Sequence, residues 1–450
     1  MSEALASESR RLPALPVGHF IEAGLLLAVG LIFVQRTPDL PVVRQAMTLS
    51  EVSFLLTAFV WLGMLSVARP KVQVYSAGLL GPFLLYVFAG LLSLLFSPYD
   101  TRDIDGIREL VARMYLMAFM LAVATYGTSL ETYRRLLLAW CAAAGVVVGL
   151  LILHVLGLDV IGVADFEGRF VGLFRNPNAS GGAIAASALV LLPIALYRGP
   201  APSLALVRTF ARWTAPGLLL ATYLSDSQGA FLALVVGLVV WPLIRASRDL
   251  GPSLAILVMV TAVPLIVAVS QIEAVGQTLQ QILVAIGYEG SGAKFDARVD
   301  MIGSRLRGIL EHPVTGVGLS KARLSHTGFT NPHGSHFTIL GITLETGVLG
   351  LAAVGTIFVA YLGIMRRNAR LPLHAYPEWR ALNEGLTMAF IGFLIFGLTH
   401  DVQTNRTMWL VATLTLCFQP AFSDAAAVTP AMPYSPSRLA WVLSHGGRRR

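Results

Sequence analysis

The stretch that decides the fold lies between residues 136 and 157 and reads LLLAWCAAAGVVVGLLILHVLG. It contains no Asp, Glu, Lys or Arg, and its one histidine is His154. An α-helix rises about 1.5 Å per residue, so about 20 apolar residues cross the roughly 30 Å hydrocarbon core of a bilayer. The run therefore predicts a membrane-spanning helix, in which we expect His154 to be a packed core residue.

Comparable apolar runs recur along the chain. Together they predict an all-α polytopic membrane protein with about twelve transmembrane helices. The seventh and eighth are short and are separated only by Ser225–Gln228. The expected spans are 16–35, 51–68, 76–96, 109–127, 136–157, 179–197, 209–225, 229–245, 252–271, 336–363, 381–399 and 406–422.

The composition supports this class and excludes others. Of the 450 residues, 55% are hydrophobic and 13% are charged, and the mean hydropathy is +0.70. Soluble domains carry roughly 25% charged residues, and a soluble chain of this length could not hide so much apolar surface. The composition therefore argues against a soluble enzyme, a disordered tail protein and a fibrous repeat. The two cysteines, Cys141 and Cys417, lie inside apolar runs and form no metal-binding or disulfide pattern.

The net charge of +8 has a simple explanation in a membrane protein, since cytoplasmic loops carry excess Lys and Arg. A nucleic-acid partner is the weaker interpretation, and we expect none. The positive-inside rule and an even number of spans both predict that the two termini are cytoplasmic. The basic residues that mark the inner loops are Arg10, Arg11, Arg69, Lys71, Arg134, Arg135, Arg198, Arg208, Arg212, Arg245, Arg248, Arg366, Arg367, Arg370 and Arg448–Arg450.

This pattern predicts one transmembrane domain over residues 1–422 and a loosely ordered cytoplasmic tail over 423–450, which is rich in Ala, Pro and Ser. The domain includes a long outer loop over residues 272–335. Loops of that length are usually functional or disordered. Within it, residues 296–310 have the spacing of an amphipathic helix lying near the membrane surface.

The first cluster of polar residues precedes the sixth span and runs from Gly168 to Asn178. It holds Arg169, Arg175 and Asn178 among turn residues. Guanidinium forks and backbone N–H groups can hold an anion there. The alternative is an interfacial loop whose arginines pair with lipid phosphates.

The second cluster lies in the long loop. Arg298 and Arg305 are seven residues apart and share one face of the predicted helix, and Glu311–Gly318 follows with the turn residues Pro313, Gly316 and Gly318. Two interpretations stay open: a second anion site, or a solvated helix face.

The third cluster opens the tenth span with His333 and His336 and continues to Glu345. A neutral imidazole at a membrane boundary can accept a proton from an alcohol near neutral pH. The alternative is an interfacial or capping histidine. A metal site is less favoured, because no third ligand has supporting spacing. Asp226 and the pair His400 and Asp401 are minor candidates at predicted outer boundaries.

The three clusters, in this order and topology, resemble the O-antigen ligase and polymerase family of bacterial surface-glycan enzymes. The matching patterns are R-x-x-G-x-x-x-N-P-N over Arg169–Asn178, an Arg-bearing helix leading to P-x-x-G-x-G over Arg298–Gly318, and H-x-x-x-L-x-x-x-L-E-x-G-x-x-G over His336–Gly350. There are two departures: Gln228 stands where the family often has Arg, and Phe337 stands where Asn often follows the His.

The resemblance implies a fold similar to C-type glycosyltransferases and a metal-independent, inverting glycosyltransferase of the bacterial inner membrane that uses no cofactor. The implied donor is a glycan on undecaprenyl pyrophosphate, and the implied acceptor is a sugar hydroxyl of a glycan or lipid A core. His336 would be the base, and Arg169 and Arg298 would hold the diphosphate. Further substrate contacts would come from Arg175, Asn178, Arg305, His333, Glu345 and Asp401.

The resemblance leaves the exact reaction open. An O-antigen ligase, an O-antigen polymerase and an exopolysaccharide polymerase need the same chemistry on the periplasmic face, where the loop 272–335 would lie. A transporter or flippase of lipid-linked glycans is the alternative from a different class. It would favour ionisable residues near the bilayer midplane and broken helices.

Overall fold

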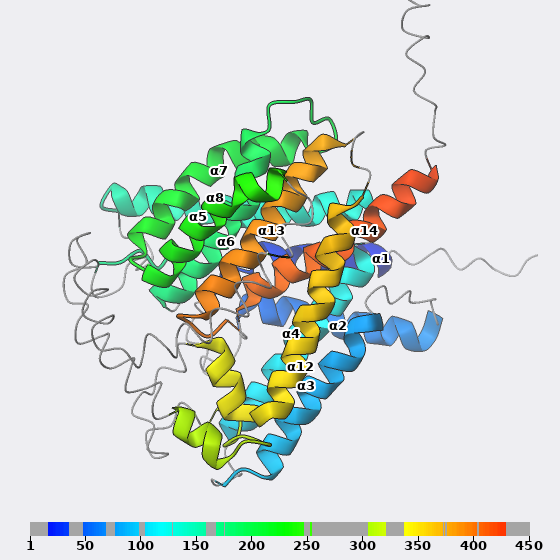
Figure 1. Ribbon diagram of the computed structural model, residues 1–450. Helices are drawn as coiled ribbons and strands as arrows, with labels where there is room; N and C mark the ends of the chain where they lie inside the picture. Colours follow the sequence, from blue (N-terminus) through cyan, green and yellow to red (C-terminus); the bar gives the residue numbers. More distant parts are fainter. Residues whose placement is uncertain are drawn as a thin grey trace, which may run out of the picture.

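The computed structural model describes residues 17–35, 48–68, 77–98, 104–127, 129–158, 168–174, 176–246, 253, 305–320, 337–371, 373, 376–402 and 405–428. These residues form eleven long helices and a short one over 305–311 (Figure 1). The long helices are α1 (Val17–Gly30), α2 (Leu49–Ala68), α3 (Ala77–Leu95), α4 (Ile104–Tyr126), α5 (Leu130–Val155), α6 (Pro177–Leu196), α7 (Ala205–Leu224), α8 (Gln228–Ala246), α12 (Thr338–Ala369), α13 (Pro377–Gly397) and α14 (Arg406–Val428).

The helical class predicted from the sequence is confirmed for this part of the chain. Each of the eleven long helices coincides with a predicted span, while the ninth span, 252–271, lies almost wholly outside the described residues. Among the described helices, α5, α6, α8 and α12 are long and apolar enough to cross a membrane. Shorter apolar stretches lie in α1, α2, α3 and α14. The total of twelve spans and the long outer loop stay predictions.

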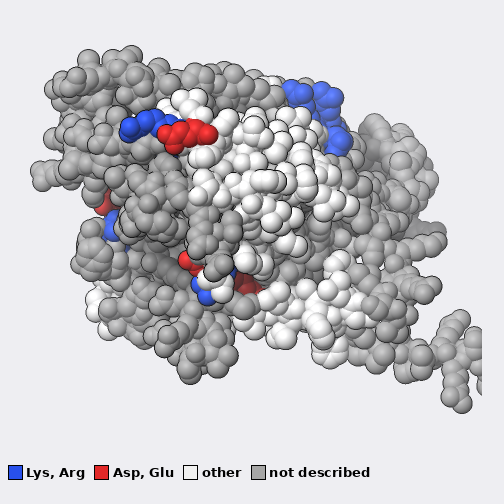
Figure 2. All heavy atoms as spheres, turned by 90° about the horizontal axis from the view of Figure 1, so that it is seen from below, with Lys and Arg blue, Asp and Glu red and all other residues white. Residues whose placement is uncertain are grey.

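The surface of the bundle is apolar over wide areas. Phe59, Trp213 and Val239 are each more than 60% exposed, which suits helices that face lipid. Seen from below, the described surface carries only a few small groups of charged side chains (Figure 2). The helices and the apolar surface together are those of a membrane protein.

The centre of the bundle is α6, which packs against α7, α8 and α13 (Figure 1). Its sequence explains the close packing, because small residues leave room for neighbouring backbones. Gly385 of α13 is an extreme case: a Cβ there would lie 2.4 Å from the carbonyl oxygen of Val190. From α5, the indole N–H of Trp140 donates to Ser187 Oγ of α6 at 3.1 Å.

A second group of helices lies beside this centre. α12 runs along α3, and α14 contacts α4, α5, α12 and α13 and so joins the two groups (Figure 1). α14 continues to Val428, past residue 422, which is the last residue of the predicted membrane domain. The boundary of the membrane domain is otherwise a prediction.

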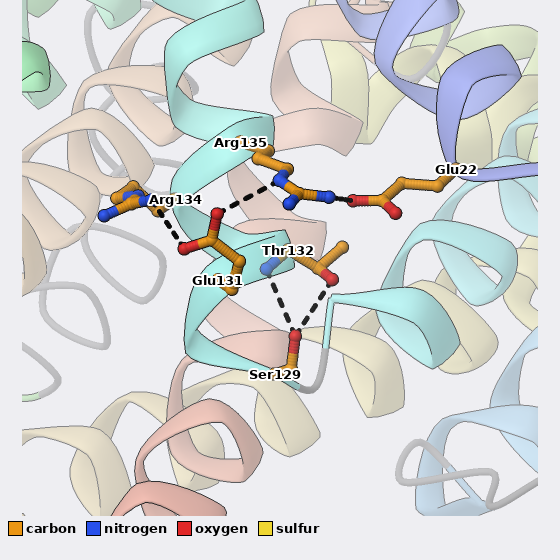
Figure 3. A network of polar contacts seen from close by, with 6 residues as sticks. All are labelled: Glu22, Ser129, Glu131, Thr132, Arg134 and Arg135. Atoms are coloured by element: carbon orange, nitrogen blue, oxygen red, sulfur yellow. Dashed lines mark hydrogen bonds and ion pairs between the residues drawn. The ribbon is translucent and has the colours of Figure 1, made fainter. Parts of the chain in front are cut away.

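A network of ion pairs marks one end of the bundle, at the start of α5 (Figure 3). Ser129 caps the helix, and Glu131 pairs with Arg134 at 2.6 Å and Arg135 at 3.1 Å. Arg135 also reaches Glu22 of α1 at 2.8 Å. Since both arginines belong to the predicted inner loops, we call this end the basic end.

The close approach of α6 and α13 makes a testable prediction. Gly385→Ala places a methyl group against the Val190 backbone, and overpacking of this kind typically costs about 1–3 kcal/mol. We expect a lower melting temperature of the purified protein in detergent. Gly363→Ala in α12 is the control, because a Cβ there meets nothing within 4 Å. Equal melting temperatures for the two variants would contradict this packing.

Candidate functional site

Several helix ends meet at the end of the bundle opposite the basic end. We call this the junction end, and it comprises the ends of α1, α7 and α13 and the starts of α6, α8 and α12. These termini come from distant parts of the sequence and are joined by backbone and side-chain contacts.

Arg169 belongs to a short segment, 168–174, that is fixed by its backbone. The Phe170 N–H donates to the carbonyl oxygen of Leu224 at the end of α7, at 2.9 Å. The Leu173 carbonyl accepts from the N–H of Gln35, beyond α1, at 2.9 Å. Phe170 is fully buried, and its ring centroid lies 5.7 Å from that of His154. We expected His154 to be a packed core residue, but its side chain is only partly buried. The position of Arg169 is therefore set by the helix ends on both sides.

Asn178 lies in the first turn of α6. Asn176 is the N-cap of this helix, and its side-chain oxygen accepts from the N–H groups of Asn178 and Ala179 at 2.7 and 3.4 Å. Pro177 occupies the first helical position, where its missing N–H is tolerated. The Asn-Pro-Asn pattern thus has a structural explanation as a helix start, beside any role in binding.

The turn between α7 and α8 connects this segment to α13. A Cβ on Gly181 of α6 would lie 2.5 Å from Ser225 Oγ in the turn, and one on Gly229 of α8 would lie 2.7 Å from His400 Nδ1. The His400 ring stacks on Phe396 with centroids 4.5 Å apart. The α7–α8 turn is therefore in contact with α6 on one side and with the His400 turn on the other.

The start of α12 is bound to the same turn. The Thr338 hydroxyl donates to the carbonyl oxygen of His400 at 2.8 Å and accepts from the N–H of Val402 at 3.0 Å. Asp401 lies between these two partners in the sequence. Thr338 follows His336 by two residues, so the sequence neighbour of the expected base is held against the His400–Val402 turn.

Further along, α12 unwinds at Gly347, whose φ of 64° and ψ of −163° are non-helical. The turn that follows the short helix 305–311 binds there. The Val317 N–H donates to the Leu344 carbonyl at 2.8 Å, and the Val348 N–H donates to the Pro313 carbonyl at 2.8 Å. The second and third sequence patterns, P-x-x-G-x-G and L-E-x-G, therefore form one structural unit.

Arg305 begins the short helix and is only 1% exposed. The interpretation of this arginine as part of a solvated face is wrong, because Ile309 on the same helix packs against Val317 and Leu344 and draws the helix inward. Burial lowers the pKa of Arg305 to about 10, while the negative charges of Asp401 and Glu345 act to raise it. At neutral pH, well below that pKa, the guanidinium is protonated.

Glu345 carries the other charge at the unwound turn. Its carboxylate pairs with Arg113 of α4, with Nη2 to Oε2 at 2.5 Å, and both side chains are at least 97% buried. Glu109, one helical turn before Arg113, accepts from Arg113 Nε at 3.3 Å. The sequence interpretation missed Arg113. Two ionisable residues four apart inside an apolar span were the available signal.

The five predicted site residues that the structure describes all lie at or near the junction end. Arg305, Glu345 and Asp401 are close enough to influence one another electrostatically, and Arg169 and Asn178 belong to the adjoining segment. The other four, Arg175, Arg298, His333 and His336, lie outside the described residues. Within the described part, no group of three or more His, Cys, Asp or Glu could hold a metal ion.

The part of the sequence that contains the short helix and the unwound turn of α12 matches a known family. Residues 214–355 fit the family model described as O-antigen ligase. This part of the chain is similar to the O-antigen ligase family. The resemblance found in the sequence patterns is confirmed here, and the family it matches consists of glycosyltransferase-like enzymes of O-antigen pathways. Comparison with the curated proteins finds no match.

The O-antigen ligase region extends from inside α7 to inside α12. It therefore includes the α7–α8 turn, the short helix, the unwound turn of α12 and, among the predicted site residues, Arg298, Arg305, His333, His336 and Glu345. The first pattern, Arg169–Asn178, precedes it, and Asp401 follows it. The first pattern contacts this region through the hydrogen bond from Phe170 to Leu224, and Asp401 is close enough to Arg305 to act on its charge.

The unwound turn of α12 yields a prediction. In Gly347→Ala, an L-residue would sit at positive φ, and its Cβ would lie 2.1 Å from the Val314 carbonyl oxygen. We expect the Pro313–Gly318 turn to leave α12, so that the amides of Val317 and Val348 exchange faster with deuterium. Gly355→Ala, on the same helix with nothing within 4 Å, serves as the control. Unchanged exchange in Gly347→Ala would show that the kink does not hold the turn.

Proposed function

We propose that the protein is an O-antigen ligase-type glycosyltransferase of the bacterial inner membrane. It moves a glycan from undecaprenyl pyrophosphate to a sugar hydroxyl, on a glycan or lipid A core, at the periplasmic face. The observation that carries the proposal is the junction end, where the Arg169 segment, the buried Arg305 and the start of α12 belong to one continuous set of contacts. Both termini are then cytoplasmic, with the basic end inside.

The leaving group of this reaction is a diphosphate, so catalysis needs fixed positive charge where negative charge develops. We assign this role to Arg169 and Arg298, with Arg175 and Arg305 as additional cations. Arginine suits the task because its planar fork binds phosphate in a bidentate manner and stays charged. Burial of Arg305 supports the assignment, since its charge is little screened by water.

The acceptor hydroxyl must lose a proton, and His336 is the proposed base. The fixed start of α12 supports this, because Thr338 is bonded to the His400–Val402 turn. Attack from the face opposite the diphosphate inverts the anomeric centre, and the arrangement needs no metal. Asn178, His333, Glu345 and Asp401 complete the proposed substrate contacts. Glu345 would act on the substrate through its neighbours, because its carboxylate pairs with Arg113.

The donor also carries an isoprenoid tail, which needs an apolar path beside the site. An apolar cavity of about 80 Å³ lies between α12 and α13. It begins beside Thr338 and Val402, at the junction end, and continues to Phe358 and Phe390. We assign this cavity to the part of the isoprenoid tail nearest the diphosphate, because it adjoins the junction end.

A polymerase of O-antigen or exopolysaccharide repeat units would use the same site and is the alternative within the enzyme class. A flippase gains some support from the broken helix α12 and its buried ion pair, both of which are features of transporters. Transfer of glycan by the purified protein in detergent separates these classes, because a flippase has no reaction to catalyse without a membrane.

The experiment that tests the proposal is deletion of the gene in its own bacterium, followed by gel analysis of surface glycans. We expect bare lipid A core and an accumulation of lipid-linked polymer. Core carrying one repeat unit would instead identify a polymerase. An intact lipopolysaccharide ladder with loss of another surface glycan would identify an exopolysaccharide enzyme.

Complementation of that deletion strain tests the base. A positioned base typically contributes about 10²–10⁴-fold to a rate. We expect His336→Ala to reach the membrane at the parental level and to restore no detectable surface glycan. His19→Ala is the control, because this residue is in α1 near the basic end. Normal surface glycan in the His336→Ala strain would remove this residue from the mechanism.

A further inference from the structure

Arg113 is a buried charged side chain beside the unwound turn of α12, and the site described above does not use it. It comes from α4, pairs with Glu345 of α12 and with Glu109 of its own helix, and lies 5.1 Å from the ring centroid of Tyr86 of α3. At 2% exposure it contacts neither solvent nor lipid to any extent. Such a residue cannot be explained as a surface ion pair, so its partners indicate what it does.

The principal partner, Glu345, is the residue at which two structural units join. Its backbone carbonyl accepts from the Ser93 hydroxyl of α3 and from the Gly318 N–H of the following turn. Its carboxylate, on the other side, is held by Arg113. The side chain and the backbone of one residue thus tie α4, α3 and the Pro313–Gly318 turn to the same point of α12.

That turn is continuous with the helix that bears Arg305. The Gly316 N–H donates to the His312 carbonyl, and the His312 N–H donates to the Gly308 carbonyl, both at 3.1 Å. Ile309 packs against Val317 and Leu344. A shift of Glu345 would therefore be transmitted through the turn to the short helix, and so to Arg305.

We infer that Arg113 is a positioning residue for the anion site, an inference that rests on the proposed function. By neutralising Glu345 inside the bundle, it fixes the unwound turn of α12, and through the Pro313–Gly318 turn it sets the place of Arg305. Arg113 touches no substrate. It also keeps the Glu345 carboxylate from competing with the diphosphate for Arg305.

A second variant at Glu345 tests whether Arg113 acts through this partner, while the docking of the turn and the kinetics separate positioning from stability alone. Removing one partner of a buried pair leaves an uncompensated charge, whereas removing both can be nearly neutral. If Arg113 acts through Glu345, loss of the Glu345 charge should rescue loss of Arg113. An effect that arises from the other contacts of Arg113, with Glu109 and Tyr86, would not be rescued in this way.

The test first measures the position of the turn directly. Val314 and Val348 are both more than half exposed and flank the contact between the turn and α12, whereas Cys141 and Cys417 are buried. With cysteines introduced at these two valines, a short thiol cross-linker reports whether the turn is docked. We expect Arg113→Met to lower the cross-linking yield at least fivefold, and Arg113→Met with Glu345→Gln to recover at least half of the parental yield.

The second measurement is transfer from the lipid-linked donor by the purified protein without introduced cysteines. We expect kcat/KM for the donor to fall at least tenfold in Arg113→Met and to recover in part in Arg113→Lys, which keeps the charge. KM for the acceptor should not change. Arg135→Met is the matched control, because it breaks an interhelix ion pair of similar length, 2.8 Å, at the basic end.

The outcomes separate the two ideas. Cross-linking and kcat/KM within twofold of the parent in Arg113→Met would overturn the positioning role, as would a double variant no better than the single one. If Arg113→Met does not fold, the cross-linking yield and kcat/KM of Arg113→Lys and of Glu345→Gln are compared with the parent instead, since both substitutions nearly preserve the volume of the side chain. If the parent transfers no glycan, the proposed function fails, while the cross-linking result still judges the position of the turn.

Discussion

The unwound turn of α12 is the constraint on which the junction end depends. A helix that stayed regular through Glu345 and Gly347 would use its carbonyl groups internally. Because α12 unwinds at Gly347, the carbonyls of Leu344 and Glu345 can accept from the Pro313–Gly318 turn and from Ser93. The ion pair between Glu345 and Arg113 then places this irregular backbone inside the bundle rather than in lipid, where free polar groups would be very unfavourable.

The other helix ends form a platform around that point. Thr338 holds the start of α12 to the His400–Val402 turn, Gly229 packs on His400, and Phe170 joins the Arg169 segment to the end of α7. No single pair of residues builds the site. The site is built by short contacts between helix termini, and these contacts fix charged side chains that come from separate parts of the sequence. This explains why three weak patterns, far apart in the chain, carry information only together.

The sequence predicted the helical class well because its signal, long apolar runs, is local. Each of the eleven long helices coincides with an expected span. The link between the P-x-x-G-x-G and L-E-x-G patterns was out of reach, because it depends on backbone hydrogen bonds between residues far apart in number. The same holds for Arg305: spacing showed which residues share its face, but only the packing of Ile309 on Leu344 shows that this face is buried. Arg113 was visible as a charge inside a span, yet its partner lies 232 residues away.

Because Arg113 and Glu345 are 232 residues apart, Arg113 enters the bilayer during synthesis before its principal partner exists. α4 is synthesised long before α12, and N-terminal parts of a chain fold first during synthesis. When α4 enters the bilayer, the only carboxylate available to Arg113 from the described partners is Glu109, one turn earlier on the same helix. This local pair lowers the unfavourable free energy of inserting a lone guanidinium. Glu109 then compensates the charge of the arginine from the start and still pairs with it in the folded bundle, where Glu345 becomes its second partner once α12 has been synthesised.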